Sequence, residues 1–338
     1  MVKDVKNLHT IVSRHRSEHL PSNIQSVSKD ITIMICTRNN YKILDQTLAA
    51  ICRCYVPPEV KWEVVLINNN SSDKTAQIAE RYSNKLPLIY AVEREVGVSR
   101  AKNLGLELAK GKLVIFTDDD VIPSAQWILA YWQCYKQKGE DFYLGGSIES
   151  CFLGQLNERQ MEMIRFAPLA SVRGLNLGTK ARILEANENF IGPNWACPLI
   201  PLKNAGMFDV QMGLGAERGR IKTGEETELM YRLKKKGLKP WYIPEAKIKH
   251  KVPMHKVTMK HISSRIEAGG FASTAHSMAE DNSKLFLGVP RWIYRLLAKR
   301  YMGYLFKKSL RLNYLQEYFQ FKFLLGMVRG YRCKMNGS

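Results

Sequence analysis

The chain has 338 residues, of which 45% are hydrophobic, a composition typical of a globular protein with one large or two ordinary domains. No apolar stretch reaches the roughly 18 residues that a membrane-spanning helix needs, and the N-terminus has no apolar core of signal-peptide length, which argues against membrane spanning and secretion. The net charge of +20 is uneven, because residues 247–338 hold 18 Lys and Arg against 4 Asp and Glu and so carry +14 of it.

Strands and helices are predicted to alternate from residue 29 onward, after an N-terminal extension at 1–28. Apolar runs predict strands at 31–37, 62–67, 88–92 and 113–117, and helical patterns lie at 43–54, 73–83, 98–110 and 125–136. This alternation favours an α/β domain with a mostly parallel central sheet that helices flank on both faces. We expect the domain to cover residues 29–252.

The second half of the chain departs from this rhythm. A Gly-rich loop at 213–224 leads into an amphipathic helix at 225–233, which Gly237 ends, and a last strand is predicted at 241–250. Beyond it, residues 253–338 are expected to form a basic, amphipathic helical C-terminal region. The segments 291–308 and 319–332 mix aromatic, Leu and basic residues, a pattern typical of an anchor on an anionic membrane surface. A helix packed on the α/β domain with a solvated basic face is the alternative.

Polar residues follow three of the predicted strands at the points where those strands end. They are the segments 36–39 and 68–73, and the three carboxylates Asp118, Asp119 and Asp120. Ligands of open α/β sheets bind at the carboxyl ends of the strands, so these clusters predict a nucleotide site at one sheet edge. Adjacent carboxylates repel one another unless a cation such as Mg²⁺ or Mn²⁺ compensates them, and a solvated acidic loop is the other interpretation.

Seven cysteines are scattered along the chain without zinc-site spacing. An odd number of dispersed cysteines is typical of reduced thiols in a cytosolic protein. The predicted location is therefore cytoplasmic, and the basic C-terminal region leaves open a peripheral place on the cytoplasmic face of the cell membrane.

Six motifs stand in order along residues 29–252. They are Cys36-Thr-Arg-Asn39, the run 68–73, Gly97-x-x-Arg100-x-x-Asn103, Asp118-x-Asp120, Gly224-Glu-Glu-x-x-Leu229 and His250. This ordered set resembles family 2 glycosyltransferases of the GT-A fold. The resemblance implies transfer of a sugar from a nucleotide diphosphate sugar to a hydroxyl group, with inversion by direct displacement. A processive enzyme is not expected, because the Gln-x-x-Arg-Trp motif of processive synthases is missing.

The resemblance also implies a metal site for Mn²⁺ or Mg²⁺ that is formed by Asp118, Asp120 and His250. In extended backbone Asp118 and Asp120 point to the same side, while Asp119 points to the other side, where it can contact the sugar. A departing nucleoside diphosphate carries charge that a metal ion can neutralise, so the chemistry requires such a site. For His250 the alternative is an exposed histidine at a strand end.

Further roles follow from the same motifs. UDP-sugar is the favoured donor, although Asn69 stands where many relatives have Asp. Asn194 and Trp195 are expected on the acceptor side, and the acceptor is expected to be a lipid-linked or cell-envelope glycan. The residues expected to bind the nucleotide sugar are Cys36, Thr37, Arg38, Asn39, Asn69, Arg100, Asn103, Asp118 and Asp119.

The resemblance places the catalytic base at the start of the 225–233 helix. Glu226 matches the position of a family carboxylate that is usually Asp, and Glu225 is the alternative. The positive end of a helix favours an ionised carboxylate, as a base requires. The rival class is a non-catalytic basic protein that binds nucleic acid or an anionic surface, but no nucleic-acid-reading motif is present and nucleic acid is not an expected partner.

Overall fold

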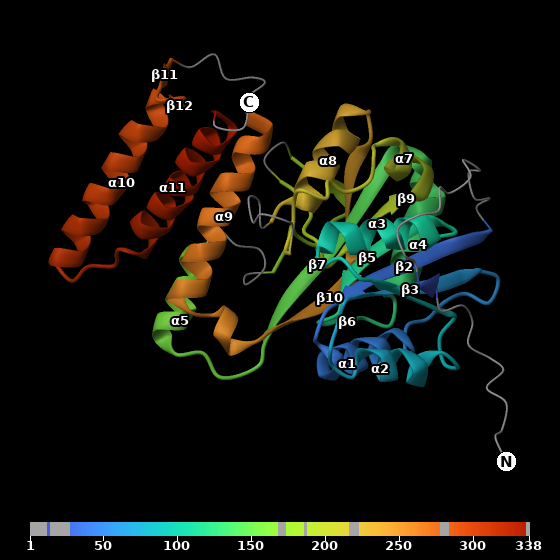
Figure 1. Ribbon diagram of the computed structural model, residues 1–338. Coiled ribbons are helices and arrows are strands. Elements are labelled where there is room, and N and C mark those ends of the chain that lie inside the picture. Colours follow the sequence, from blue (N-terminus) through green and yellow to red (C-terminus); the bar gives the residue numbers. More distant parts are fainter. Residues whose placement is uncertain are drawn as a thin grey trace.

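The structure, a computed structural model, describes residues 12–13, 28–167, 174–185, 188–215, 223–277 and 284–335. It has an α/β body around a twisted sheet and a group of long helices to one side (Figure 1). The predicted extension at 1–28 lies outside the described residues except for 12–13 and 28, and so does the middle of the 213–224 loop.

One large sheet forms the centre of the body. Its strands are β1 (Val12–Ser13), β2 (Lys29–Thr37), β3 (Trp62–Asn69), β4 (Leu88–Glu93), β5 (Gly111–Asp118), β6 (Val121–Pro123), β7 (Phe142–Phe152), β8 (Arg182–Ile183), β9 (Trp195–Pro198) and β10 (Lys239–Val252). Their order is β1-β4-β3-β2-β5-β9-β7-β10-β6, with β8 beside β10. The pairs from β1 to β5 are parallel, while β9 and β6 run antiparallel to their neighbours.

Helices cover both faces of this sheet, which confirms the predicted architecture. They are α1 (Tyr41–Ile51), α2 (Thr75–Tyr82), α3 (Val98–Leu108), α4 (Trp127–Lys138), α7 (Leu199–Asn204) and α8 (Glu225–Lys235), with a 3-10 turn η1 at Gly139–Asp141. Because side chains alternate along a strand, Ile33 and Ile35 pack against α1, α2 and α4, and Met34 faces the cluster of α3, α7 and α8. Strand β2 is therefore buried on both sides, as its continuous apolar sequence predicts.

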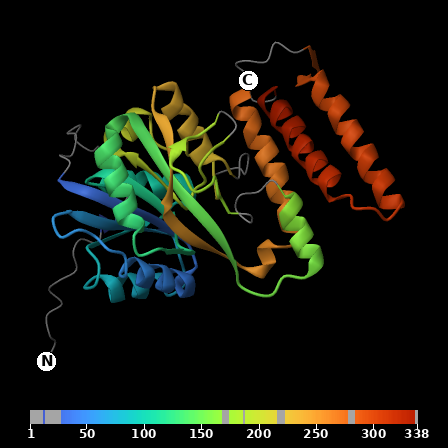
Figure 2. The same cartoon turned by 180° about the vertical axis from the view of Figure 1, so that it is seen from behind.

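The C-terminal region is helical, as the sequence predicts. It consists of η3 (Met254–Lys256), α9 (Met259–Ser277), the hairpin β11 (Leu285–Phe286) and β12 (Val289–Pro290), α10 (Arg291–Ser309) and α11 (Leu315–Met335). Together with α5 (Glu158–Phe166) these helices stand beside the sheet, and α10 is farthest from it in both views (Figures 1 and 2). Within the described ranges, none of the helices combines the length and apolar composition that crossing a bilayer requires.

Candidate active site

The polar clusters of the sequence meet because three parallel strands end at the same level. In the register of the sheet, Cys36 of β2 stands opposite Ile67 of β3 and Asp118 of β5, and Thr37 stands opposite Asn68. The segments that follow these strands are also tied together. The backbone N–H of Ser72 donates to Asn39 Oδ1 at 2.8 Å, which joins the β2 and β3 ends into one polar rim.

Asp118, Asp120 and His250 form a cluster at this rim. Their ligand atoms all lie within 4.8 Å of one another. His250 reaches this rim because its strand, β10, pairs with the short strand β6. In that pairing His250 stands opposite Val121 of β6, the residue that follows Asp120. The structure thus joins two parts of the chain that are 130 residues apart in sequence, and it buries both Asp120 and His250.

The acidic cluster has the features of a cation site. Oδ1 of Asp120 is buried and receives no hydrogen bond, although His250 Nε2 lies 3.2 Å away, and Lys256 Nζ lies 3.2 Å from Oδ2. Burial opposes ionisation of Asp120, but His250 and Lys256 outweigh it and lower the pKa of this carboxyl group. Two carboxylates and one imidazole are ligands that suit Mg²⁺ and Mn²⁺, so the residues fit a divalent metal ion.

Asp119 has different surroundings from its two neighbours. Its carboxylate accepts hydrogen bonds from Thr37 Oγ1 at 2.5 Å and from Asn40 Nδ2 at 2.9 Å, on the β2 side of the rim. Burial is the main cause that raises the pKa of Asp119 to about 7. The three consecutive aspartates therefore divide, with Asp118 and Asp120 beside His250 and Asp119 beside β2.

Two of the predicted donor-side residues, Asn69 and Arg100, are held by protein contacts in this structure. Asn69 donates to the carbonyl oxygen of Glu95 at 2.8 Å and accepts from the N–H of Gly97 at 2.9 Å, so its side chain fixes the loop after β4. Arg100 pairs with Glu95 at 3.1 Å. Cys36 is partly buried and burial raises the pKa of its thiol to about 12, whereas Arg38 is exposed.

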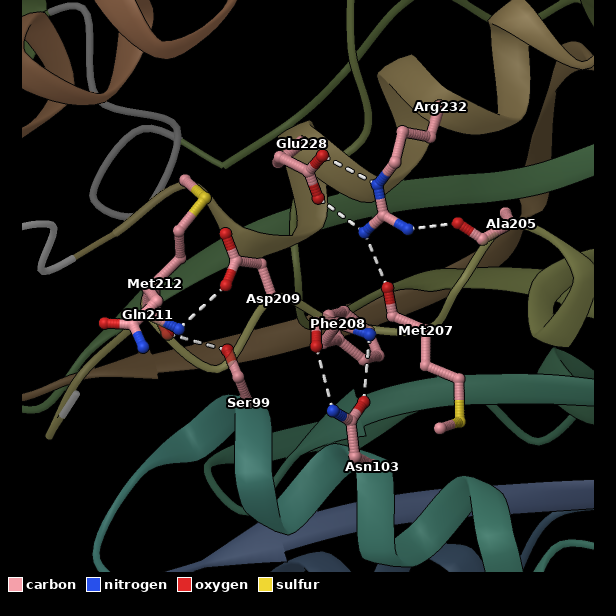
Figure 3. A network of polar contacts seen from close by, with 10 residues as sticks. All are labelled: Ser99, Asn103, Ala205, Met207, Phe208, Asp209, Gln211, Met212, Glu228 and Arg232. Atoms are coloured by element: carbon pink, nitrogen blue, oxygen red, sulfur yellow. Dashed lines mark hydrogen bonds and ion pairs between the residues drawn. The ribbon is translucent and has the colours of Figure 1, made fainter. Parts of the chain in front are cut away.

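Asn103 belongs to a network that connects α3 with α8 (Figure 3). Its side chain exchanges two hydrogen bonds with the backbone of Phe208, at 2.8 and 2.9 Å. Ser99, one turn earlier, donates to the carbonyl oxygen of Met212 at 2.7 Å. From the other side, Arg232 of α8 donates to the carbonyl oxygen of Met207 at 2.6 Å. The segment between α7 and α8 is thus fixed to α3 on one side and to α8 on the other.

Asn194 and Trp195, predicted on the acceptor side, are both fully buried in the core. Oδ1 of Asn194 accepts from Trp127 Nε1 and Tyr131 Oη, and Nδ2 donates to the carbonyl oxygens of Ser147 and Ala246. Trp195 stacks on a strand residue of the core, Phe116, with ring centroids 4.3 Å apart. The structure assigns these side chains to packing, since no acceptor can touch them without a rearrangement.

The two glutamates at the start of α8 lie next to Lys102, a residue that sequence reasoning missed. Lys102 Nζ is 3.1 Å from Glu225 Oε1 and also pairs with Glu226. Lys102 lies on the buried side of α3 among Ser99, Ala101 and Leu106. A lysine on the apolar face of a predicted helix needs a buried negative partner, and this was the sequence signal that could have pointed to Lys102. Burial and Glu225 raise the pKa of Glu226 to about 7, whereas Lys102 outweighs burial at Glu225 and lowers its pKa.

Comparison with known proteins agrees with this geometry. The model of the family "Glycosyl transferase family 2" matches residues 32–196. Validoxylamine A glucosyltransferase of Streptomyces hygroscopicus subsp. limoneus is 31% identical over 100 residues, which are 29% of this chain and 22% of that protein. The chain thus spans well under two thirds of this relative's length.

Solved structures share the fold. S. aureus TarS 1-349 in complex with UDP-GlcNAc superposes with a TM-score of 0.53 at 15% identity, covering 89% of this chain and 91% of the other. The mannosyltransferase PcManGT of Pyrobaculum calidifontis, in complex with GDP-Man and Mn²⁺, gives 0.56 at 17% identity, covering 89% and 88%. The fold is therefore that of GT-A glycosyltransferases. The family match covers strands β2 to β9, so the chain is similar to glycosyl transferase family 2 over this part of the sheet.

Proposed function

We propose that this protein transfers one sugar from a nucleotide diphosphate sugar to a hydroxyl acceptor, with inversion at the anomeric carbon. The observation that carries the proposal is the cluster of half-buried Asp118 with buried Asp120 and His250 at the carboxyl edge of the sheet, close to a pair of glutamates. The family match and the GT-A fold support the class of reaction. The bond from the anomeric carbon to the diphosphate breaks as the bond to the acceptor oxygen forms.

The metal site would serve the departing diphosphate. Asp118, Asp120 and His250 would hold Mn²⁺ or Mg²⁺, which neutralises the negative charge that develops on the leaving group. Lys256, paired with Asp120, adds a further positive charge beside the cluster. The Mn²⁺ in PcManGT supports a divalent ion but does not decide between the two metals.

The glutamate pair would serve the acceptor. A base must remove the proton of the acceptor hydroxyl as the oxygen attacks, and Glu226 or Glu225 at the start of α8 can take that proton. A carboxylate with a pKa of about 7, as burial gives Glu226, is a stronger base than an ordinary glutamate and is still ionised in a large fraction of molecules near neutral pH.

A UDP-sugar is the proposed donor, and a lipid-linked or cell-envelope glycan is the proposed acceptor. The UDP-GlcNAc bound to TarS supports a uridine donor, whereas the GDP-Man bound to PcManGT shows that the fold also takes guanosine. A poly(ribitol-phosphate) beta-glucosyltransferase of Bacillus spizizenii, among the relatives, supports a polymer acceptor. We place the protein in the cytoplasm, at the inner face of the cell membrane.

The C-terminal helices support this membrane position. Of the fifteen large hydrophobic side chains that are exposed among the described residues, ten lie between 285 and 312. Met302 and Phe306 of α10 are 63% and 64% exposed, and α10 contains no acidic residue. Exposed apolar side chains interspersed with Arg295 and Lys299 suit a layer of anionic lipid headgroups. The α10 helix packs on α11, which leaves this face open.

A panel of nucleotide sugars tests the proposed function. The protein is incubated with each donor and with extracts of cell-envelope glycan, with and without Mn²⁺, and release of nucleoside diphosphate is measured. We expect release from one donor class that depends on both metal and acceptor. Absence of release from every donor, together with failure of Mn²⁺ to bind, would contradict the proposal.

A further inference from the structure

Lys256 brings a second cation to the predicted metal cluster. Its Nζ lies 3.2 Å from Oδ2 of Asp120, while Nε2 of His250 lies 3.2 Å from Oδ1 of the same carboxylate. Oδ1 is buried and accepts no hydrogen bond, so it is the oxygen left for a metal ion that Asp118 and His250 also hold. Asp120 would therefore face the metal with one oxygen and the ammonium group of Lys256 with the other.

The backbone holds Lys256 in this place. Lys256 belongs to the turn η3, in which its N–H donates to the carbonyl oxygen of Pro253 at 2.9 Å. The next residue, Val257, is fully buried among side chains of α5, α9 and α11. From β10, the N–H of Lys251 donates to the carbonyl oxygen of Asp120 at 2.8 Å. Backbone contacts thus keep Lys256 and Asp120 next to each other independently of their ion pair.

The charges of the cluster leave Lys256 available for an anion. Among the described residues, Asp120 is the one carboxylate that forms an ion pair with Lys256. A divalent ion carries enough charge to neutralise both Asp118 and Asp120, so the lysine is then left without a negative partner from the protein. Its side chain is 32% exposed, which lets the ammonium group reach a ligand at the rim.

Further positive charge lies on the same side of the cluster. Burial lowers the pKa of His261, and the nearby charges of Arg265 and Lys256 also lower it. The ring of His255 stands 6.4 Å from that of His261, centroid to centroid, and the first turn of α9 has no acidic residue. A positive field of this kind attracts an anion to the place where the metal would hold the donor diphosphate.

We propose that Lys256 binds the diphosphate of the donor and makes the metal and the donor bind together. This inference rests on the proposed function and deepens it, because it assigns a second cation to the leaving group. Without a donor, Lys256 and the metal repel each other across Asp120, so Lys256 weakens binding of the metal alone. With a donor, the diphosphate oxygens attract both cations, and each cation strengthens binding of the donor.

A lysine that only holds η3 against the acidic run would behave differently. Its removal would lower the stability of the protein, and it would weaken binding of the metal and of the diphosphate together or leave both unchanged. A lysine that binds the diphosphate beside the metal gives opposite changes when it is removed. The sign of the two changes therefore separates the roles.

Two binding measurements on the full chain read these signs. Binding of Mn²⁺ alone is followed by the electron paramagnetic resonance signal of the free ion, and binding of UDP and of GDP is followed by calorimetry at saturating Mn²⁺. We expect Lys256→Met to bind Mn²⁺ about threefold more tightly, a modest gain because solvent screens a partly exposed charge. The same variant should bind the nucleoside diphosphate at least about tenfold more weakly, the usual effect of losing a hydrogen bond to a charged group.

Three further variants control for charge, position and folding. Lys256→Arg keeps the positive charge and should keep the wild-type order of both affinities. Lys260→Met is the matched control, because Lys260 is exposed at the start of α9, and it should change neither affinity. Lys256→Gln keeps a polar side chain and should show the same opposite changes as Lys256→Met, which gives a second reading if the Met variant is unstable.

Wild-type affinity for the nucleoside diphosphate in Lys256→Met and Lys256→Gln would overturn the inference, and so would a fall of both affinities together. Those results leave the proposed function in place if the wild type binds Mn²⁺ and releases nucleoside diphosphate from a donor. Opposite changes in a protein that releases nothing from any nucleotide sugar would refute the proposed function and not the role of Lys256. A wild type that binds neither Mn²⁺ nor either nucleotide would refute both.

Discussion

Replacing Asn194 with Ala should destabilise the protein without acting directly on acceptor binding. The side chain is fully buried and its amide group makes four hydrogen bonds, with Trp127, Tyr131, Ser147 and Ala246. A buried polar group that loses its partner costs about 1–3 kcal/mol, so four such groups cost at least about 4 kcal/mol. At about 2.1 cal/mol/K of unfolding entropy per residue over 338 residues, this loss lowers Tm by about 6 °C.

Thermal unfolding followed by circular dichroism measures this shift. Asn84→Ala is the matched control, because Asn84 is exposed in the turn after α2 and its replacement should change stability by less than about 0.5 kcal/mol. If Asn194→Ala unfolds at the same temperature as this control and only raises the KM for the acceptor, then Asn194 is an acceptor-binding residue and the structural reasoning fails.

Two further predictions concern the metal site and the membrane face. His250→Gln should raise the Mn²⁺ concentration for half-maximal activity by at least about tenfold, because losing even a hydrogen-bond partner of a metal ligand costs 10–100-fold in metal affinity or activity. His255 is exposed, so His255→Gln is the control and should leave this concentration unchanged. If both variants need the same Mn²⁺ concentration, His250 is not part of the metal site. The protein should float with vesicles that contain anionic lipid, and changing Trp292, Met302 and Phe306 together to Ser should abolish flotation. As a control, changing the exposed residues Leu153, Met161 and Ile183 together to Ser should leave flotation intact. The membrane face is contradicted if the wild-type protein stays in the soluble fraction at low salt, or if it binds only a second copy of itself.

The architecture followed from sequence because its signals are local. Continuous apolar runs such as 31–37 are what a strand buried on two faces requires, and the structure buries Ile33, Met34 and Ile35 against helices on both sides. Neighbouring parallel strands end at the same edge of the sheet, so their polar ends come together there whatever contacts are made by distant parts of the chain. The grouping of Asp118 and Asp120 at that edge could be predicted for this reason.

Contacts between segments distant in the chain could not be predicted in this way. Lys102 meets Glu225 across 123 residues, and whether a lysine on a helix is buried depends on what packs over it. The same reason explains Asn194, whose polarity suggested a ligand contact but whose four partners come from three other parts of the chain. A polar residue in sequence does not reveal whether it faces a substrate or the core.

The most direct test of the metal-dependent transfer is turnover by Asp120→Ala on the best donor. Asp141→Ala is the matched control, because Asp141 is an exposed carboxylate in the turn η1. We expect Asp120→Ala to lose release of nucleoside diphosphate at all Mn²⁺ concentrations while keeping the wild-type Tm within a few degrees, and we expect the control to remain active. Release at the wild-type rate by Asp120→Ala would contradict the account.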